Sequence, residues 1–148
     1  MRLAPVLFAL ALAPTAASAQ IEEPRIPLQT KMSELNRFRV EYAENWNNKN
    51  VNALIGMWAA DAMFNDADGK TYKGSDAVKQ WYTERAANMP HMVIESDSLA
   101  IYGNTAVDMG TTKMHPAGGA EQVARYMVVL RRNMNGWKVV RAAITPVM

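Results

Sequence analysis

Four long runs of alternating apolar and polar residues fill the chain after Pro90. They cover residues 91–102, 105–114, 120–132 and 137–145, and short segments rich in glycine, asparagine and proline separate them. An alternation with a period of two predicts strands that bury one face, and turns this short join strands that run in opposite directions. The second half of the chain is therefore expected to fold as an antiparallel meander.

Three amphipathic helices are predicted before these strands. Their apolar residues recur at spacings of three and four: Leu35, Phe38, Tyr42 and Trp46 in the first helix, Val51, Leu54, Ile55 and Trp58 in the second, and Val78, Trp81 and Tyr82 in the third, where Arg85 continues the helical spacing. The first pattern begins at Ser33, and Asn50 and Ser75 are expected to cap the second and third helices. The third helix is expected to end near Asn88, before Pro90.

Two short strands are predicted between the second and third helices, at residues 62–66 and around Tyr72, with Asp68-Gly69 as the turn between them. Helices first and an antiparallel sheet afterwards is the α+β pattern, with the helices packed on one face of the sheet. A strongly curved sheet wrapped around helices forms a cone with a cavity at its open end. We expect the functional site in that cavity.

The amino terminus has the layout of a secretory signal. Residues 1–19 combine a basic start, an apolar run at 3–13 and the small residues Ala17-Ser18-Ala19, which predicts cleavage after Ala19 and a periplasmic or secreted protein. The apolar run is shorter than the roughly 20 residues that span a bilayer, so no membrane span is expected after cleavage. Residues 20–30 are expected to form a flexible leader and residues 31–148 the folded domain.

Composition excludes several classes of function. The 148-residue chain has no Cys, which excludes disulfide scaffolds, cysteine nucleophiles and zinc fingers. Its 16 Lys and Arg interleave with 14 Asp and Glu, so no nucleic-acid partner is expected. No phosphate-binding glycine loop or metal-ligand spacing is present, and neither a cofactor nor a metal is predicted. His91 and His115 could instead act as proton shuttles at the mouth of the cavity.

The sequence resembles the nuclear transport factor 2-like superfamily, and most of all its SnoaL-like and ketosteroid isomerase-like branch. The resemblance is carried by residues 50–66, Asp68-Gly69, Gly74 and the closing hairpin 125–139 around Asn135-Gly136-Trp137. The resemblance covers most of the mature domain. It implies a cone-shaped α+β fold with three amino-terminal helices on a curved, mostly antiparallel sheet. It implies less about function, because this fold hosts enzymes, binding modules and association domains.

The isomerase branch implies roles for three residues. Its catalytic base, a carboxylate on the first strand, falls on Asp66, and its hydrogen-bond donor to the developing enolate falls on Tyr42. A supporting tyrosine falls on Tyr82. Such a pair implies proton abstraction next to a carbonyl, as in an isomerase, lyase or cyclase.

The sequence departs from the isomerase pattern at two positions. A tyrosine that completes the family's hydrogen-bond network is replaced by Trp58. The family's second donor, a protonated aspartate, has no counterpart, since the region offers Tyr126 or Val128. These departures, together with the predicted export, argue against steroid isomerisation itself.

The same residues can be interpreted without the family. Strand alternation places Asp66 on the face of Phe64, where apolar surroundings would raise the pKa of its carboxyl toward the working pH. Tyr42 shares a helix face with Trp46, so its hydroxyl should end inside the pocket and find a partner there. Alternatively, Asp66 forms the turn before Gly69, and Tyr42 and Tyr82 are core residues.

Asp108 lies among apolar residues of a predicted strand. It is expected either to pair with an arginine on a neighbouring strand or to be a second acid in the pocket. Phe64, Trp46, Trp58 and Tyr126 are expected to complete the pocket wall.

Our leading hypothesis is an exported enzyme in which Asp66 is the base and Tyr42 the oxyanion donor, acting on a small apolar or aromatic carbonyl compound. One alternative is a non-catalytic module that binds an apolar ligand. Another is an association domain, which predicts a cone filled by Trp46, Trp58 and Trp81. A homodimer is expected, because the open face of such sheets commonly pairs two copies in the resembled superfamily.

Overall fold

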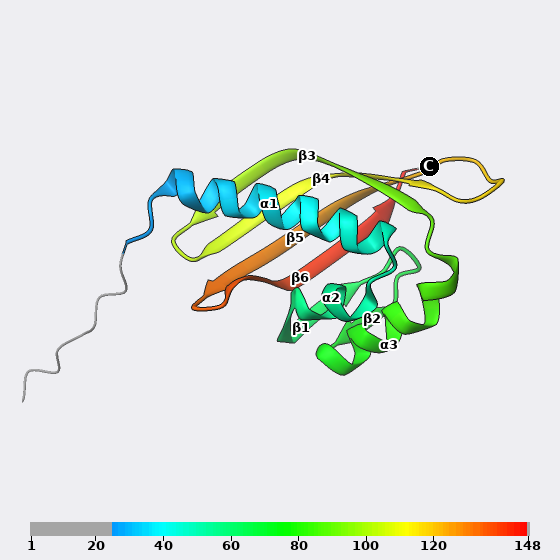
Figure 1. The fold of residues 1–148 in the computed structure, drawn as a ribbon, viewed down its shortest axis with the longest axis horizontal. Helices are drawn as coiled ribbons and strands as arrows, with labels where there is room; N and C mark the ends of the chain where they lie inside the picture. The colour runs from blue at the N-terminus through cyan, green and yellow to red at the C-terminus, as the bar shows by residue number, and fades with distance from the viewer. Residues whose placement is uncertain (1–24, 148) are drawn as a thin grey trace, which may run out of the picture.

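The computed structural model describes residues 25–147 (Figure 1). The predicted signal peptide and residues 20–24 of the predicted leader lie outside these residues. The helices are α1 (Leu28–Asn47), α2 (Val51–Gly56) and α3 (Ser75–Arg85), followed by the short 3₁₀ helix η1 (Ala86–Asn88). The strands are β1 (Trp58–Asn65), β2 (Thr71–Lys73), β3 (His91–Tyr102), β4 (Thr105–His115), β5 (Gln122–Asn133) and β6 (Gly136–Pro146).

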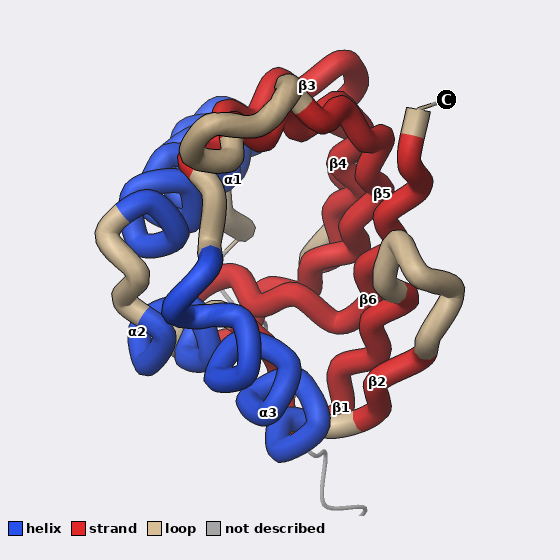
Figure 2. Tube along the Cα trace, turned by 90° about the vertical axis from the view of Figure 1, so that its right-hand side faces the viewer, coloured by secondary structure: helices blue, strands red, loops and turns tan. Residues whose placement is uncertain are grey.

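The six strands form one sheet in the order β2-β1-β6-β5-β4-β3. Strands β3 to β6 pair antiparallel with their neighbours in sequence, which confirms the meander. Strand β1 joins β6 in parallel and pairs β2 antiparallel. Figure 2 shows the helices along one side of the molecule and the curved sheet along the other. The α+β architecture with helices on one face of the sheet is therefore confirmed.

The four long strands lie within two residues of their predicted bounds, whereas the helix ends differ more. Helix α1 begins at Leu28, directly after Pro27, rather than at Ser33. Asn50 caps α2 as predicted, since its side chain accepts from the Ala53 amide. The prediction that Trp58 belongs to α2 is wrong, because α2 ends at Gly56 and Trp58 opens β1.

Ser75 is the first residue of α3 and not its cap, so that prediction is also wrong. The residue before the helix is Gly74, whose φ of 83° lies in the region that favours glycine. Its amide donates to the Ala62 carbonyl of β1 at 2.8 Å. The chain therefore turns sharply from β2 into α3 and brings the helix back onto β1.

A cluster of aromatic side chains packs α1 and α3 against β1. The ring of Trp81 meets those of Tyr82 and Phe64 edge to face, each with centroids 4.9 Å apart. Trp46 of α1 and Trp58 of β1 also contact Tyr82, which is fully buried. Aromatic pairs of this geometry add stability beyond the area that they bury. The cluster fixes the angle at which both helices meet the sheet.

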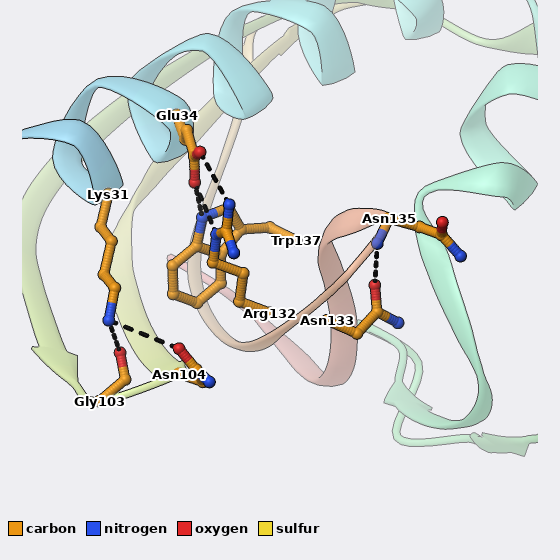
Figure 3. A network of polar contacts seen from close by, with 8 residues as sticks. All are labelled: Lys31, Glu34, Gly103, Asn104, Arg132, Asn133, Asn135 and Trp137. Carbon is orange, nitrogen blue, oxygen red and sulfur yellow. Dashed lines mark hydrogen bonds and ion pairs between the residues drawn. The ribbon is translucent and has the colours of Figure 1, made fainter. Parts of the chain in front are cut away.

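Glu34 ties the first half of α1 to the sheet (Figure 3). Its carboxylate accepts hydrogen bonds from Nε and Nη2 of Arg132 at 2.9 and 3.1 Å, and from Nε1 of Trp137 at 2.9 Å. One turn earlier, Lys31 donates to the Gly103 carbonyl in the β3–β4 turn. The carboxylate thus links α1 to β5 and β6 through charge-assisted bonds, which are the stronger class of hydrogen bond.

Replacing Glu34 by glutamine should lower the free energy of unfolding by about 2 kcal/mol, because a neutral amide cannot accept all three bonds. Urea denaturation measures the change. Glu41→Gln is the matched control, since Glu41 pairs with Arg37 on the exposed face of the same helix. Equal losses in the two variants would contradict the assigned role of Glu34.

The same comparison has a defined pH dependence. The hydrogen bond from Arg132 lowers the pKa of Glu34 from its ordinary value of 4.5. A depressed pKa in the folded state adds stability that is complete above the unfolded-state pKa and is lost as the pH falls through the folded-state pKa. The stability gap between wild type and Glu34→Gln should therefore be constant near neutrality and narrow below about pH 4.5. A gap that widens in acid would be the opposite result.

Candidate active site

A cavity of about 740 Å³ lies between the helices and the inner face of the sheet. Most of its wall is apolar, and the predicted site residues that line it are Tyr42, Trp46, Trp58, Phe64, Asp66, Asp108 and Tyr126. Tyr82 is not among the lining residues; it is fully buried and contacts the site through the hydroxyl of Tyr42. Trp46, Trp58 and Trp81 contribute to the wall but leave this volume open, which the association-domain alternative does not predict.

Tyr42 belongs to a chain of three hydrogen-bonded side chains. Its hydroxyl lies 2.7 Å from the hydroxyl of Tyr82, which accepts the indole N–H of Trp58 at 2.9 Å. An indole nitrogen only donates, so the Tyr82 proton is available for Tyr42, and the Tyr42 proton is then available to the cavity. Burial raises the pKa of Tyr42 to about 12. The phenol therefore stays a proton donor at physiological pH.

Asp66 follows β1 and is buried against α3. Its Oδ2 accepts the indole N–H of Trp81 at 2.8 Å and pairs with Nη2 of Arg85 at 3.0 Å. Its Oδ1 accepts the Ala67 amide at 2.6 Å. The expectation of a carboxylate in purely apolar surroundings is therefore wrong. Residues 81 and 85 are one helical turn apart, so both partners reach Asp66 from the same face of α3.

Asp66 also shapes the turn that follows β1. Its amide donates to the Lys70 carbonyl, and its carbonyl accepts the Gly69 amide, both at 2.9 Å. The turn-forming interpretation of Asp66 and its position in the cavity wall are thus both correct. The turn holds the backbone of Asp66, while Trp81 and Arg85 orient its carboxylate.

Asp108 on β4 forms a second polar centre in the wall. Its Oδ2 accepts Nε and Nη2 of Arg39 at 3.0 and 2.9 Å and the Tyr126 hydroxyl at 3.3 Å, and its Oδ1 accepts the Ser96 hydroxyl at 2.5 Å. The predicted arginine partner exists, but it lies on α1 and not on a neighbouring strand. Burial, followed by the charge of Asp108, raises the pKa of Tyr126 to about 12.

Sequence reasoning assigned no role in the site to Arg39 or Arg85, although it placed Arg85 on the helical stripe of Trp81. Arg85 shares the helical stripe of Trp81, and Arg39 precedes Tyr42 by one turn, so both follow the apolar face of their helix. A basic residue at such a position points toward the core and needs an acidic partner there. A basic residue on the apolar face of a helix could therefore have identified both arginines from the sequence, but it does not reveal which acidic residue pairs with each.

The two histidines lie opposite each other at the ends of β3 and β4, with ring centroids 6.2 Å apart. His115 also lies 3.5 Å from Glu121. Neither histidine is part of the cavity wall. Within residues 25–147 there is no cluster of three histidine or acidic side chains that could hold a metal ion, and no helix long and apolar enough to cross a membrane.

A curved sheet closed by helices around a ligand-sized cavity defines the nuclear transport factor 2-like class, and solved structures of that class share this fold. Residues 40–142 match the family described as a SnoaL-like domain. The chain therefore belongs to the SnoaL-like family. No curated protein matches the sequence.

Several solved structures are similar. A candidate dehydratase of the nuclear transport factor 2-like family from Streptomyces avermitilis has a TM-score of 0.73 and 19% identity, over 81% of this chain and 98% of that one. A ketosteroid isomerase-like protein from Erwinia carotovora atroseptica has a TM-score of 0.70 and 13% identity, over 80% and 97%. A candidate scytalone dehydratase from Novosphingobium aromaticivorans has a TM-score of 0.67 and 12% identity, over 81% and 86%. Identities this low show a shared fold alone.

Proposed function

We propose that this protein is an exported small-molecule enzyme. In this proposal Asp66 removes a proton from a carbon next to a carbonyl group, and Tyr42 stabilises the resulting oxyanion. The products are those of an isomerisation, elimination or cyclisation. The observation that carries the proposal is that both side chains line one largely apolar cavity of about 740 Å³.

The contacts of Asp66 suit a base. Arg85 offsets the negative charge of the carboxylate, since its Nη2 lies 3.0 Å from Oδ2. Both side-chain partners act on Oδ2, while Oδ1 accepts a single backbone amide. A carboxylate oxygen has two acceptor sites, so Oδ1 keeps one that can take a proton from a ligand.

The contacts of Tyr42 suit an oxyanion donor. Trp58 donates to Tyr82, and in this proposal Tyr82 donates in turn to the Tyr42 oxygen; hydrogen bonds in such a chain strengthen one another. The Tyr42 proton is then free to bind the ligand oxygen on which negative charge develops. One fixed donor in a site that excludes water contributes about a hundredfold or more to rate.

The cavity favours a small apolar or aromatic carbonyl ligand. Its volume lies within the range of sites that bury drug-sized ligands, and three tryptophans contribute flat apolar surface. One similar structure, from Novosphingobium aromaticivorans and 21% identical, is described as a candidate aromatic ring hydroxylase, and a ring-shaped ligand would suit these flat walls. We favour a lyase or isomerase reaction on such a ring.

Proton abstraction can be measured before the natural substrate is identified. Tetralone and related bicyclic ketones are incubated with the purified protein in deuterium oxide, and loss of the proton next to the carbonyl is followed by NMR. The proposal predicts exchange well above the rate with an equal concentration of albumin. Binding of the ketones without any acceleration would favour the non-catalytic module instead.

Export and self-association belong to the same proposal. Export predicts that the mature protein begins at Gln20, which intact mass measurement checks; an uncleaved chain would contradict it.

On the outer face of the sheet, Met109 and Met127 are register partners and are 41% and 47% exposed. We propose that this face pairs two copies. Light scattering measures the molar mass in solution, and the mass of a monomer at micromolar concentration would contradict the proposed dimer.

A further inference from the structure

The cavity wall holds a second polar centre that the proposed proton abstraction does not use. It consists of Asp108, Arg39, Tyr126 and Ser96, and we call it the Asp108 cluster. Four hydrogen bonds converge on the Asp108 carboxylate, three on Oδ2 and one on Oδ1. Asp108, Arg39 and Tyr126 line the cavity.

The local structure of the sheet is adapted to this cluster. Gly110 lies two residues after Asp108 on the same face of β4, and a Cβ atom there would approach the Tyr126 hydroxyl to 2.8 Å and collide with the Glu95 carbonyl. The missing side chain lets the Tyr126 hydroxyl lie over β4 and reach Asp108. The strand register also shifts between Ser96 and Ser98, directly beside Gly110. Two separate features of the strands therefore favour the cluster.

Stability alone does not explain such an arrangement. Removing two charges from water costs free energy that their mutual attraction often fails to recover, and apolar residues of similar volume frequently serve a fold as well or better. The inner face of the sheet is otherwise largely apolar at this level, with Val128 opposite Asp108. A charged pair retained in the wall of a ligand-sized cavity is more readily explained by what it binds.

The charges of the cluster select the kind of ligand group. Arg39 and Asp108 offset each other, so an anionic group would meet the carboxylate and a cationic group would meet the guanidinium. A neutral hydroxyl avoids both conflicts, because it can donate to Asp108 or to the Tyr126 oxygen and can accept from Arg39. Tyr42, one helical turn from Arg39, can offer its hydroxyl proton to a carbonyl or phenolic oxygen.

We propose that the Asp108 cluster recognises a hydroxyl group on the ligand. The ligand is then a hydroxylated ring compound whose first oxygen meets Tyr42 and whose second, a hydroxyl, meets Asp108 and Tyr126. This deepens the proposed function, since it rests on the same cavity as the ligand site, but it requires binding only and not proton abstraction.

Binding of naphthol and the isomeric naphthalenediols tests this directly. These probes share one flat ring system and differ in the second hydroxyl. Isothermal titration calorimetry should show at least one diol binding about fivefold or more tightly than naphthol. Tyr126→Phe should abolish that preference, because it removes the hydroxyl and keeps the ring. Tyr42→Phe should weaken naphthol and the diols alike.

Two further variants make the result decisive. Tyr102→Phe is the matched control, since Tyr102 is 68% exposed on β3, and it should keep the preference. Asp108→Asn should abolish it as Tyr126→Phe does. Equal binding of naphthol and all diols by the wild type would overturn the proposal, as would a preference that survives both cluster variants. The ketone exchange experiment in deuterium oxide tests a different claim. If the protein catalyses exchange but shows no preference for a diol, only the hydroxyl-recognition proposal is wrong. If it prefers a diol but does not catalyse exchange, only the proposed proton abstraction is wrong.

Discussion

Replacing Asp66 by asparagine is expected to lower the rate of proton abstraction by about a thousandfold, within the usual range for loss of a positioned base. The amide has nearly the same shape, and its oxygen can still accept from Trp81 and Arg85. It cannot take up a proton from carbon. The loss should therefore fall on kcat, while the affinity for a ketone ligand changes little.

Initial rates of exchange and ligand titrations, measured on the same samples, separate these two quantities. Asp68→Asn is the matched control, because Asp68 lies two residues further along the same turn, is exposed and is not part of the cavity wall. Its rate should equal that of the wild type. If Asp66→Asn keeps more than about a tenth of the wild-type rate, Asp66 is not the base.

Replacing Tyr42 by phenylalanine should lower kcat by about a hundredfold, because it removes a donor whose bond to the ligand strengthens as negative charge develops. Tyr82→Phe should have a smaller effect on rate. It leaves the Trp58 indole N–H without its partner and interrupts the chain that polarises Tyr42. Exchange kinetics of both variants check this order, and an unchanged rate in Tyr42→Phe would remove Tyr42 from the mechanism.

The pH profile gives an independent test of Tyr42. Since burial raises its pKa to about 12, the phenol carries its proton throughout the neutral and mildly basic range. Its ionisation should therefore cause no loss of rate below about pH 11. A basic limb near pH 10 that is present in the wild type and absent from Tyr42→Phe would show a phenol of ordinary pKa and contradict the buried hydrogen-bond chain.

The strands of the meander were the most predictable part of the fold. Each carries an alternation of ten or so residues and ends at a turn with its own signature, as at Gly103-Asn104 and Asn135-Gly136. A shift of one residue would turn the apolar set toward solvent, so the pattern permits little error. The agreement to within two residues follows from that constraint.

The junction between α2 and β1 shows where periodicity fails. Trp58 follows Leu54 by four residues and is buried, as a helical stripe requires, yet it begins a strand. Burial of the ring is satisfied in either conformation. The choice is made by pairing of β1 with β6, where Trp58 is the register partner of Val139, 81 residues away. Local spacing carries no information about such a partner.

The sequence predicted residues that belong to the candidate site, but it did not predict which of them pair with one another. Alternation and helical spacing placed Tyr42 and Asp66 toward the interior, and both line the cavity. Their partners depend on how the elements pack. Arg39 and Asp108 are 69 residues apart, and they meet only because α1 packs on β3, the neighbour of β4 in the sheet. The ion pairs of Asp66 with Arg85 and of Asp108 with Arg39 could therefore be seen only in the tertiary structure.

The distribution of the tryptophans gives the protein a built-in optical signal. Trp46, Trp58 and Trp81 lie in the cavity wall, whereas Trp137 is held by Glu34 outside it. An aromatic guest that enters the cavity should quench the emission of the first three indoles and leave that of the fourth. Occupancy can thus be titrated in unlabelled protein, with Trp137 as an internal reference.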